Sequence, residues 1–437
     1  MAFVHPNSCE CAKSELDLFT TPPTQTSIEG GVWTEYHPIS SLDREGPIEF
    51  NISGSGDDYI DLTQTQLYVK AKIVRHDGAV CGDTDNVGPV NLLLQSLFSQ
   101  VDISLNDKLV SQSSNTYAYR AYLETLLNYG VSASSSHLTT ALWYKDTAAH
   151  MDANDITGDN AGLEERSEYT KESKTVDLIG RIHSDIFFQE KYLVSGVNVR
   201  IRFVRSSNAF VLMSNMANAA FRVEILNASL HMRKIKLSSS IQLAHAKALE
   251  ISSIKYPVIR AQVKTFSIPA GNLNTCQENL FLGQLPKRII VGCVDNDAFN
   301  GSYVKNPFNF KNFALNYMAV HIDGQQDVIK PIQPNFTTGH YIRSFSNFFM
   351  GIGKLHKDQG IIIDRADYLN GYTLYAFDLS PDMSSGGNFN LIRTGSVRLD
   401  MKFATALPNT INVVVYAEFE NIIEINRDRN ILCDFTL

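Results

Sequence analysis

Four landmarks of the sequence occur twice along the chain, in the same order. Each set has a Phe-x-Ile segment before a turn, a short strand with a polar turn and a return strand, a helical segment carrying an arginine, and an alternating strand. The pairs are 50–52 with 266–268, 101–110 with 320–329, 119–127 with 342–350, and 197–203 with 397–403. Repetition in register indicates two copies of one structural unit. The alternative, two unrelated β domains that share alternating strands, accounts less well for the helix with its arginine.

Alternation of apolar and polar residues predicts that most of these segments are β-strands. In TQLYVKAKI, every second side chain from Thr65 to Ile73 falls on one face, whereas Lys70 and Lys72 fall on the other. Similar segments are 197–203, 220–226, 288–294, 396–403 and 410–419. Helical patterns are few, at 90–99, 115–129, 243–249 and around 341–350. We therefore expect an all-β protein with a few short helices in its connections.

The repeat and the composition along the chain predict three parts. Residues 1–45 are polar, contain a Pro-Pro pair and show no sustained period, which indicates an extended N-terminal arm. Residues 46–237 and 238–437 are expected to form two similar domains. An insertion in the first, 145–173, has eight acidic against three basic residues, and we interpret it as a solvated loop. Eight or so short strands per domain favour two consecutive jelly roll sandwiches over immunoglobulin-like ones.

Composition narrows the class of protein. With 437 residues and 44% hydrophobic residues, the chain can bury more than one sizeable core. A net charge of −8 disfavours a general nucleic-acid binder. The first twenty residues lack a signal pattern, and no window approaches about 18 apolar residues, so we expect neither secretion nor a membrane span. Six scattered cysteines fit reduced thiols inside a cell, and the Asn-x-Ser/Thr triplets are interpreted as chance matches.

The most conspicuous acidic pattern fails as a calcium loop. Asp295 and Asp297 stand at its first and third positions, but Phe299 and Asn300 occupy places where such a loop needs an oxygen ligand and a glycine. The insertion 145–173 also misses the spacing. We expect no metal-binding residues.

Other chemical motifs are equally scarce in the sequence. It contains no nucleophile elbow, His-Glu-x-x-His motif, Walker A loop or dinucleotide fingerprint. Cys9 and Cys11 lie in the predicted arm without a second pair for zinc. His183, two residues before Asp185, could orient a proton, but a hydrogen-bonded histidine at a strand end is the more ordinary interpretation. We expect no catalytic residues, no cofactor and no enzyme.

Four aromatic residues follow the acidic pattern in the segment 295–310. They are Phe299, Tyr303, Phe308 and Phe310. Asn and Gly supply turns there, so the segment is predicted to be a rigid aromatic loop. Two interpretations are equally open, because both use these residue types: the rings are buried under their own loop, or they contact a neighbouring subunit.

Several long segments resemble one family of capsid proteins. The chain is similar to the major capsid proteins of Polinton (Maverick) elements and adintoviruses over nearly its whole length. The resemblance is carried by SELDLFTTPPTQTSIE at 14–29, LIGRIHSDIFFQEKYLVSGVNVRIRFVRS at 178–206, LPKRIIVGCVDNDAFNGSYVKNPFNF at 285–310, YMAVHIDGQQ at 317–326, NGYTLYAFDLSPD at 370–382 and YAEFENIIEINRDRNI at 416–431. The insertion 145–173 shows the least similarity.

The resemblance implies a fold and a function. The fold would be a double jelly roll, and three chains would form a pseudo-hexagonal homotrimer that tiles an icosahedral shell around double-stranded DNA. Implied partners are neighbouring capsomers and a single jelly roll penton protein, without sequence-specific binding to nucleic acid. The implied location is the virion, with synthesis inside a host cell, in the cytoplasm or, for assembly, the nucleus.

Two other functions stay open from the residues. A two-domain β-sandwich hydrolase would use loop carboxylates such as Asp295, Asp297 and Asp323. A carbohydrate-binding protein would use the aromatic residues as a stacking platform.

Overall fold

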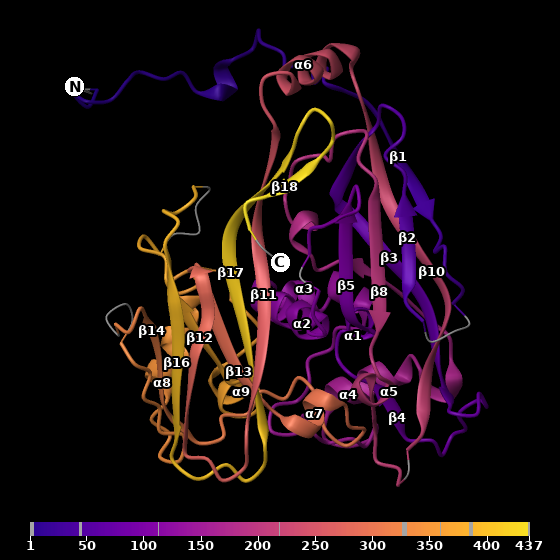
Figure 1. Cartoon of the computed structure of the whole chain (residues 1–437), viewed down its shortest axis with the longest axis vertical. Coiled ribbons are helices and arrows are strands. Elements are labelled where there is room, and N and C mark those ends of the chain that lie inside the picture. Colours follow the sequence, from indigo (N-terminus) through magenta and orange to yellow (C-terminus); the bar gives the residue numbers. More distant parts are fainter. Residues whose placement is uncertain are drawn as a thin grey trace.

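The computed structural model describes residues 4–42, 46–111, 113–217, 219–325, 330–358, 360–383 and 388–435. Two β-sandwiches stand side by side in it, one from each half of the chain (Figure 1). Their strands pair only within the same half, and every named pair is antiparallel.

The first sandwich has two four-stranded sheets, ordered β1-β10-β3-β7 and β2-β8-β5-β6, and a small ribbon of β4 with β9. Its strands are β1 (Ile28–Tyr36), β2 (Ile48–Ile52), β3 (Tyr59–Arg75), β4 (Val87–Pro89), β5 (Phe98–Leu105), β6 (Lys108–Leu109), β7 (Val176–Arg181), β8 (Val199–Arg205), β9 (Leu212–Ser214) and β10 (Phe221–Leu237). The predicted alternation is present in β3, where Leu67 and Val69 are buried and Lys70 is exposed.

The second sandwich has sheets ordered β11-β17-β13-β15, with β18 added on β17, and β12-β16-β14. Its strands are β11 (Ile254–Ile268), β12 (Asn274–Gln284), β13 (Arg288–Asp295), β14 (Leu315–Ile322), β15 (Leu374–Asp378), β16 (Thr394–Phe403), β17 (Ile411–Ile425) and β18 (Ile431–Cys433). Residues 326–329, part of the predicted return strand after β14, lie outside the described residues.

Strand order is the same in both sandwiches when the short β4, β6, β9 and β18 are set aside. In the first sandwich, β1 pairs with β10, β10 with β3 and β3 with β7. In the second, β11 pairs with β17, β17 with β13 and β13 with β15. In the facing sheets, β2 pairs with β8 and β8 with β5, just as β12 pairs with β16 and β16 with β14. Two jelly rolls in succession have this organisation. The prediction of an all-β double jelly roll is confirmed.

Helices are short and lie in connections. They are α1 (Leu93–Ser96), α2 (Tyr117–Asn128), α3 (Val131–Ser134), α4 (Ala161–Glu168), α5 (Asn208–Val211), α6 (Ser239–Leu249), α7 (Asn296–Asn300), α8 (Ile342–Gly351) and α9 (Arg365–Leu369), with 3-10 turns η1 (Ser14–Leu16), η2 (His137–Ala141), η3 (Lys171–Ser173) and η4 (Asp185–Phe187). Helix α6 links the two sandwiches at one end of the molecule (Figure 1). Within the described ranges, none of the helices has the length and apolarity to cross a membrane.

Three of the four repeated landmarks occupy equivalent places: β5 and β14, α2 and α8, and β8 and β16. The fourth does not. Phe50 lies in β2, which pairs with β8, whereas Phe266 lies in β11, which pairs with β17 in the other sheet. The counterpart of β2 is β12, which pairs with β16. The Phe-x-Ile match was wrong because three residues of an alternating pattern do not distinguish one strand from its neighbour.

One predicted boundary and one predicted interpretation need correction. The predicted arm, 1–45, includes β1, which pairs along its length with β10, so residues from Ile28 onward belong to the first sandwich. The insertion 145–173 is not a solvated loop, because it contains α4 and the completely buried Arg166. A count of charges could not reveal that burial, since it does not show that Arg166 pairs with Asp146 of the same segment and donates to the carbonyls of Pro89 and Tyr144.

The hydrophobic core joins the two halves. One cluster of buried side chains lies inside the second sandwich. The largest cluster contains residues of both halves, including Leu126 and Phe203 from the first and Ile290 and Val414 from the second. The junction between the sandwiches is therefore packed as an interior.

Gly292 in β13 gives a test of this packing. A β-carbon at this position would lie 2.5 Å from Cδ1 of Phe310 and 2.8 Å from Cδ2 of Leu374. We expect Gly292→Ala to destabilise the protein by about 1–3 kcal/mol through overpacking. Gly30→Ala is the matched control, because nothing lies within 4 Å of that position. Chemical denaturation measures both, and equal stability of the two variants would contradict the tight packing of Phe310 against β13.

Candidate functional site: the junction between the sandwiches

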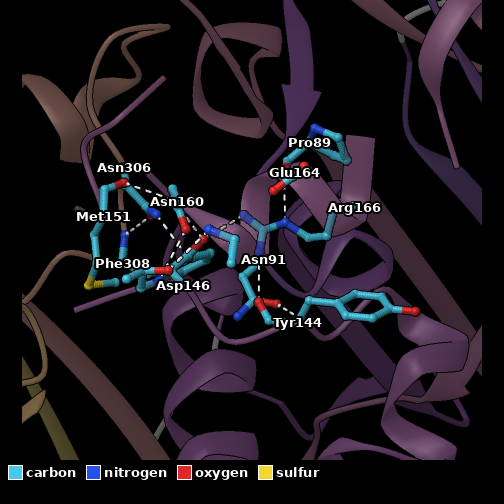
Figure 2. A network of polar contacts seen from close by, with 12 residues as sticks. Pro89, Asn91, Tyr144, Asp146, Met151, Asn160, Glu164, Arg166, Asn306 and Phe308 are labelled. Carbon is cyan, nitrogen blue, oxygen red and sulfur yellow. Dashed lines mark hydrogen bonds and ion pairs between the residues drawn. The ribbon is translucent and has the colours of Figure 1, made fainter. Parts of the chain in front are cut away.

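Two features that the sequence left unexplained meet at the junction. They are the acidic segment, residues 145–173 of the first half, and the aromatic loop, residues 295–310 of the second. A buried polar network, which we name the Arg166 network, connects them and consists of Asp146, Asn160, Arg166 and Asn306. Figure 2 shows Asp146 between Arg166 and Asn306.

Arg166 is held by three acceptors within the first half. Its Nη2 donates to Oδ1 of Asp146 at 2.7 Å, its Nε to the carbonyl of Pro89 at 2.9 Å, and its Nη1 to the carbonyl of Tyr144 at 2.6 Å. The side chains of Arg166 and Asp146 are both 0% exposed. A charge so deeply buried is tolerated only when it is paired and hydrogen-bonded, and α4 brings the guanidinium to that position.

Asp146 carries the network across to the second half. Its Oδ2 accepts from Nδ2 of Asn306 at 2.9 Å, and its backbone carbonyl accepts from the hydroxyl of Tyr372 at 2.7 Å. The backbone N–H of Asn306 donates to Oδ1 of Asp152 at 3.0 Å. Lys311 adds an ion pair with Asp152 at 2.7 Å. The acidic segment therefore uses its carboxylates as acceptors for the second sandwich.

The aromatic loop packs its rings against α2 of the first half. Phe308 stacks on Tyr122 with centroids 4.1 Å apart and planes 1° apart, and Phe299 stacks on Tyr119 at 5.4 Å. Phe310 is 6.2 Å from Tyr122. Stacked and edge-on pairs of this kind contribute beyond the area they bury.

This placement bears on the predicted subunit contacts. Phe308 and Phe310 are 0% exposed within the single chain, so their rings have no surface to offer a neighbouring subunit. Phe299 is partly buried against the same core, and the hydroxyl of Tyr303 donates to the carbonyl of Phe221 at 2.8 Å. For Phe308 and Phe310, burial is the interpretation that the structure supports.

A second polar group, the Glu124 cluster, lies at the same junction and consists of Arg120, Glu124, His183 and Asp185. Arg120 donates to Glu124 at 2.9 Å and to Asp185 at 2.6 Å, and Nδ1 of His183 lies 2.7 Å from Glu124. His183 is thus a buried, hydrogen-bonded histidine, as its position at a strand end suggested.

The second sandwich contributes two groups to the Glu124 cluster. The backbone N–H of Ala261 in β11 donates to Asp185 at 3.0 Å, and the hydroxyl of Tyr416 in β17 lies 3.4 Å from Glu124. The cluster therefore joins α2 and η4 of one sandwich to two neighbouring strands of the other.

Burial and charge shift the two carboxyl groups of the cluster in opposite directions. Burial alone would raise the pKa of Glu124, but the charge of Arg120 and the hydrogen bond with His183 lower it to about 2. Burial raises the pKa of Asp185, and the charge of Arg120 and the N–H of Ala261 only partly oppose this. Charge and hydrogen bonding thus hold the pKa of Glu124 below its ordinary value, whereas burial holds the pKa of Asp185 above its own.

The carboxylates proposed for a hydrolase have structural partners. Asp295 is paired with Lys311 at 2.7 Å, and Lys305 lies between Asp295 and Asp297. Asp323 accepts a hydrogen bond from the backbone N–H of Ser396 at 2.8 Å. Across the part of the chain that the structure describes, no group of three or more His, Cys, Asp or Glu side chains is placed to hold a metal ion.

Sequence reasoning missed the contact between the acidic segment and the aromatic loop. Asn306 and Asp146 lie 160 positions apart in the sequence. The available signal was one arginine, Arg166, among the acids of the segment 145–173, and local patterns cannot connect this segment to a distant asparagine.

The chain has similar proteins both in sequence and in fold. No protein-family model matches it. A protein of Caenorhabditis elegans, described as uncharacterized, is 27% identical over 430 residues, covering 94% of this chain and 99% of that protein.

Solved structures of viral capsids are similar in fold. A chain of the Sputnik virophage has a TM-score of 0.65 at 12% identity, covering 98% of this chain and 93% of its own. The Faustovirus major capsid protein has 0.59 at 8%, covering 94% and 92%. The mavirus major capsid protein has 0.52 at 12%, covering 100% and 97%. The chain has the fold of viral major capsid proteins. At these identities the likeness concerns the fold, which extends over both sandwiches and their junction.

Removing Arg166 tests the junction of this double jelly roll. Arg166→Met leaves Asp146 buried without its cation, and we expect a loss of about 3–5 kcal/mol in the free energy of unfolding. Lys171→Met is the control, since its pair with Glu168 is exposed and 3.9 Å long, and a change within about 0.5 kcal/mol is expected. Chemical denaturation measures both. Similar losses in the two variants would show that the Arg166 network does not stabilise the junction.

The lowered pKa of Glu124 predicts a pH dependence. A carboxyl group with a lowered pKa in the folded state stabilises it above its ordinary pKa of about 4.3, and this contribution is lost as the pH falls toward about 2. Asp185, whose pKa is raised by burial, has the opposite effect on stability, because its contribution is present at low pH and is lost as the pH rises. Glu124→Gln removes only the first contribution, so its difference from the wild type should be largest near neutral pH and shrink on acidification.

Free energies of unfolding at several pH values measure this difference. Glu168→Gln is the control, because that side chain is 63% exposed and should show no such trend. A difference between wild type and Glu124→Gln that stays constant with pH would contradict the assignment.

Proposed function

We propose that the chain is a structural major capsid protein. The observation that carries the proposal is that both sandwiches, with the same strand order, match viral capsid chains over nearly their full length. The functional unit is then the whole double sandwich. Its role in a shell is to be a rigid building block, and the buried junction supplies that rigidity.

In the proposed assembly, three chains form a homotrimer. Two similar sandwiches per chain present six similar units around the threefold axis, which gives a pseudo-hexagonal capsomer that tiles an icosahedral shell around double-stranded DNA. Neighbouring capsomers and a single jelly roll penton protein are the proposed partners. The site of action is the virion, after synthesis in a host cell.

Two observations favour a Polinton or adintovirus origin within the proposal. The resemblance in sequence covers segments in both halves, including the aromatic loop. The similarity to the protein of Caenorhabditis elegans extends over 99% of that protein, and a relative of this chain in an animal fits an integrated, transposable element. A non-enzymatic role is part of the same proposal.

The alternative functions receive less support. The hydrolase would need Asp295 free for chemistry, but Lys311 and Lys305 pair with it and it is 6% exposed. The carbohydrate-binding protein would need exposed rings, but Phe308 and Phe310 are buried.

Subunit contacts in the proposed trimer should use exposed apolar side chains. In the second sandwich, Leu282 is 75% exposed, Leu391 is 88% exposed and Ile392 is 68% exposed. Leu391 and Ile392 lie next to each other just before β16. Neighbouring exposed apolar side chains of this kind are typical of interaction surfaces.

Sizing by light scattering and electron microscopy of the purified protein test the function. We expect trimers, and shells at high concentration. Leu391→Asp should reduce trimer formation without lowering the thermal unfolding temperature, because Leu391 is 88% exposed within the single chain. Phe308→Ala should do the reverse, destabilising the fold by about 3–5 kcal/mol while trimers still form at low temperature. A wild-type protein that stays monomeric at high concentration would refute the capsid function.

A further inference from the structure

An apolar pocket lies under α6, where the chain passes from one sandwich to the other. Its volume is about 590 Å³. The apolar part of its lining comes from both halves and includes Tyr59, Val194, Leu237, Ile241, Leu249 and Tyr256. A pocket of this size can hold two or three large side chains.

One face of α6 forms the roof of the pocket. Ile241, His245 and Ala248 line it, at spacings of four and three residues, as expected for one side of a helix. His245 is fixed by the hydroxyl of Tyr59, 2.9 Å from its Nδ1. Lys191 and Glu190 lie at the same pocket, and Nζ of Lys191 donates to the carbonyl of Lys255.

The N-terminal arm begins at this pocket. Ser27 and Ile28 line it, and the carbonyl of Ser27 accepts from the N–H of Ser238 at 2.9 Å, just before α6. From there the arm extends away from the body of the protein (Figure 1). The hydrogen bonds of the described residues 4–24 all join one residue of the arm to another.

The arm exposes an apolar cluster that has no cover in a single chain. Around η1, Leu16 is 71% exposed, Leu18 is 76% exposed and Phe19 is 96% exposed. Three large apolar side chains within four residues, on a segment without other contacts, are typical of a docking motif. Glu15 and Asp17 alternate with them.

We propose that residues Leu16–Phe19 of one copy dock into the α6 pocket of a neighbouring copy. The occupant is a second copy of this chain, so the inference rests on the proposed function, which requires an assembly. Three side chains of the arm match the volume of the pocket, and Lys191, which lines it together with Glu190, is a cation for the acidic residues between them.

Chain geometry directs the arm to a neighbour. Residues 20–27 separate Phe19 from Ile28 and can span at most about 26–29 Å. Pro22 and Pro23 favour an extended path, which leads the apolar cluster away from the pocket at which its own arm begins. Mutual exchange of arms would then link adjacent copies without changing either sandwich.

A peptide titration tests the pocket directly. The probe is a fluorescent peptide of residues 14–24, and the protein is the full chain with Leu18→Ser and Phe19→Ser, so that its own arm cannot compete. Saturable binding is expected, weakened about tenfold or more by Ala248→Trp, which fills the pocket. Ala246→Trp is the matched control, because Ala246 is an exposed alanine of the same helix that does not line the pocket. Absent binding, or equal effects of the two substitutions, would overturn the proposal.

Crosslinking distinguishes exchange between copies from folding back. With the exposed Cys9, Cys11 and Cys276 replaced by serine, Phe19→Cys and Ile241→Cys chains are mixed and treated with a short bismaleimide. Covalent heterodimers are expected. Products confined to one chain, in a protein carrying both cysteines, would overturn the exchange.

These measurements separate the two hypotheses. Shells that form while the peptide does not bind would refute arm docking and leave the capsid function standing. Peptide binding and crosslinked heterodimers in a protein that forms no trimers or shells would support arm docking and refute the capsid function.

Discussion

The fixed orientation of the two jelly rolls depends on one buried carboxylate, Asp146, which pairs with Arg166 in its own sandwich and accepts a hydrogen bond from Asn306 in the other. Neither the Asp146 nor the Arg166 side chain has exposed surface, and each is tolerated in the interior only because all of its hydrogen bonds are made together. Those partners come from the acidic segment, from the end of β4 and from Asn306 in the other sandwich. A relative shift of the sandwiches would remove the Asn306 amide from Oδ2 of Asp146 and leave that buried oxygen without its donor, so the network favours one arrangement over its neighbours.

Aromatic packing and the Glu124 cluster act in the same direction. Phe308 fills the space beside Tyr122, and Ala261 and Tyr416 approach the carboxylates next to α2. Apolar contact supplies most of the stabilisation at such a junction, whereas buried polar groups restrict its geometry. The proposed capsomer needs that restriction, because small angular errors in one block would add up across a closed shell.

The fold was predictable because local sequence patterns determine it. Alternation in 65–73 and the repeat of β5, β8 and α2 by β14, β16 and α8 imply two similar β units, whatever their contacts. The junction was not predictable in this way. Arg166 among acids has the composition of a solvated loop, and the rings of the aromatic loop suit an interior or an interface equally. Whether these segments are buried depends on the contact between Asn306 and Asp146, which lie 160 positions apart in the sequence. A pattern read over a few neighbouring residues contains no information about such a contact.

The asymmetry between the two repeats explains how a duplicated chain avoids pairing like with like. Only the first half has the acidic segment, and only the second has Asn306 and Phe308 in the corresponding approach. Two first halves brought together would place Asp146 against no amide donor, and two second halves would place Phe308 against no Tyr122. Each alternative leaves buried groups unpaired, which costs more than the shared contacts return. The insertion that breaks the repeat is therefore what makes the repeat usable as one block.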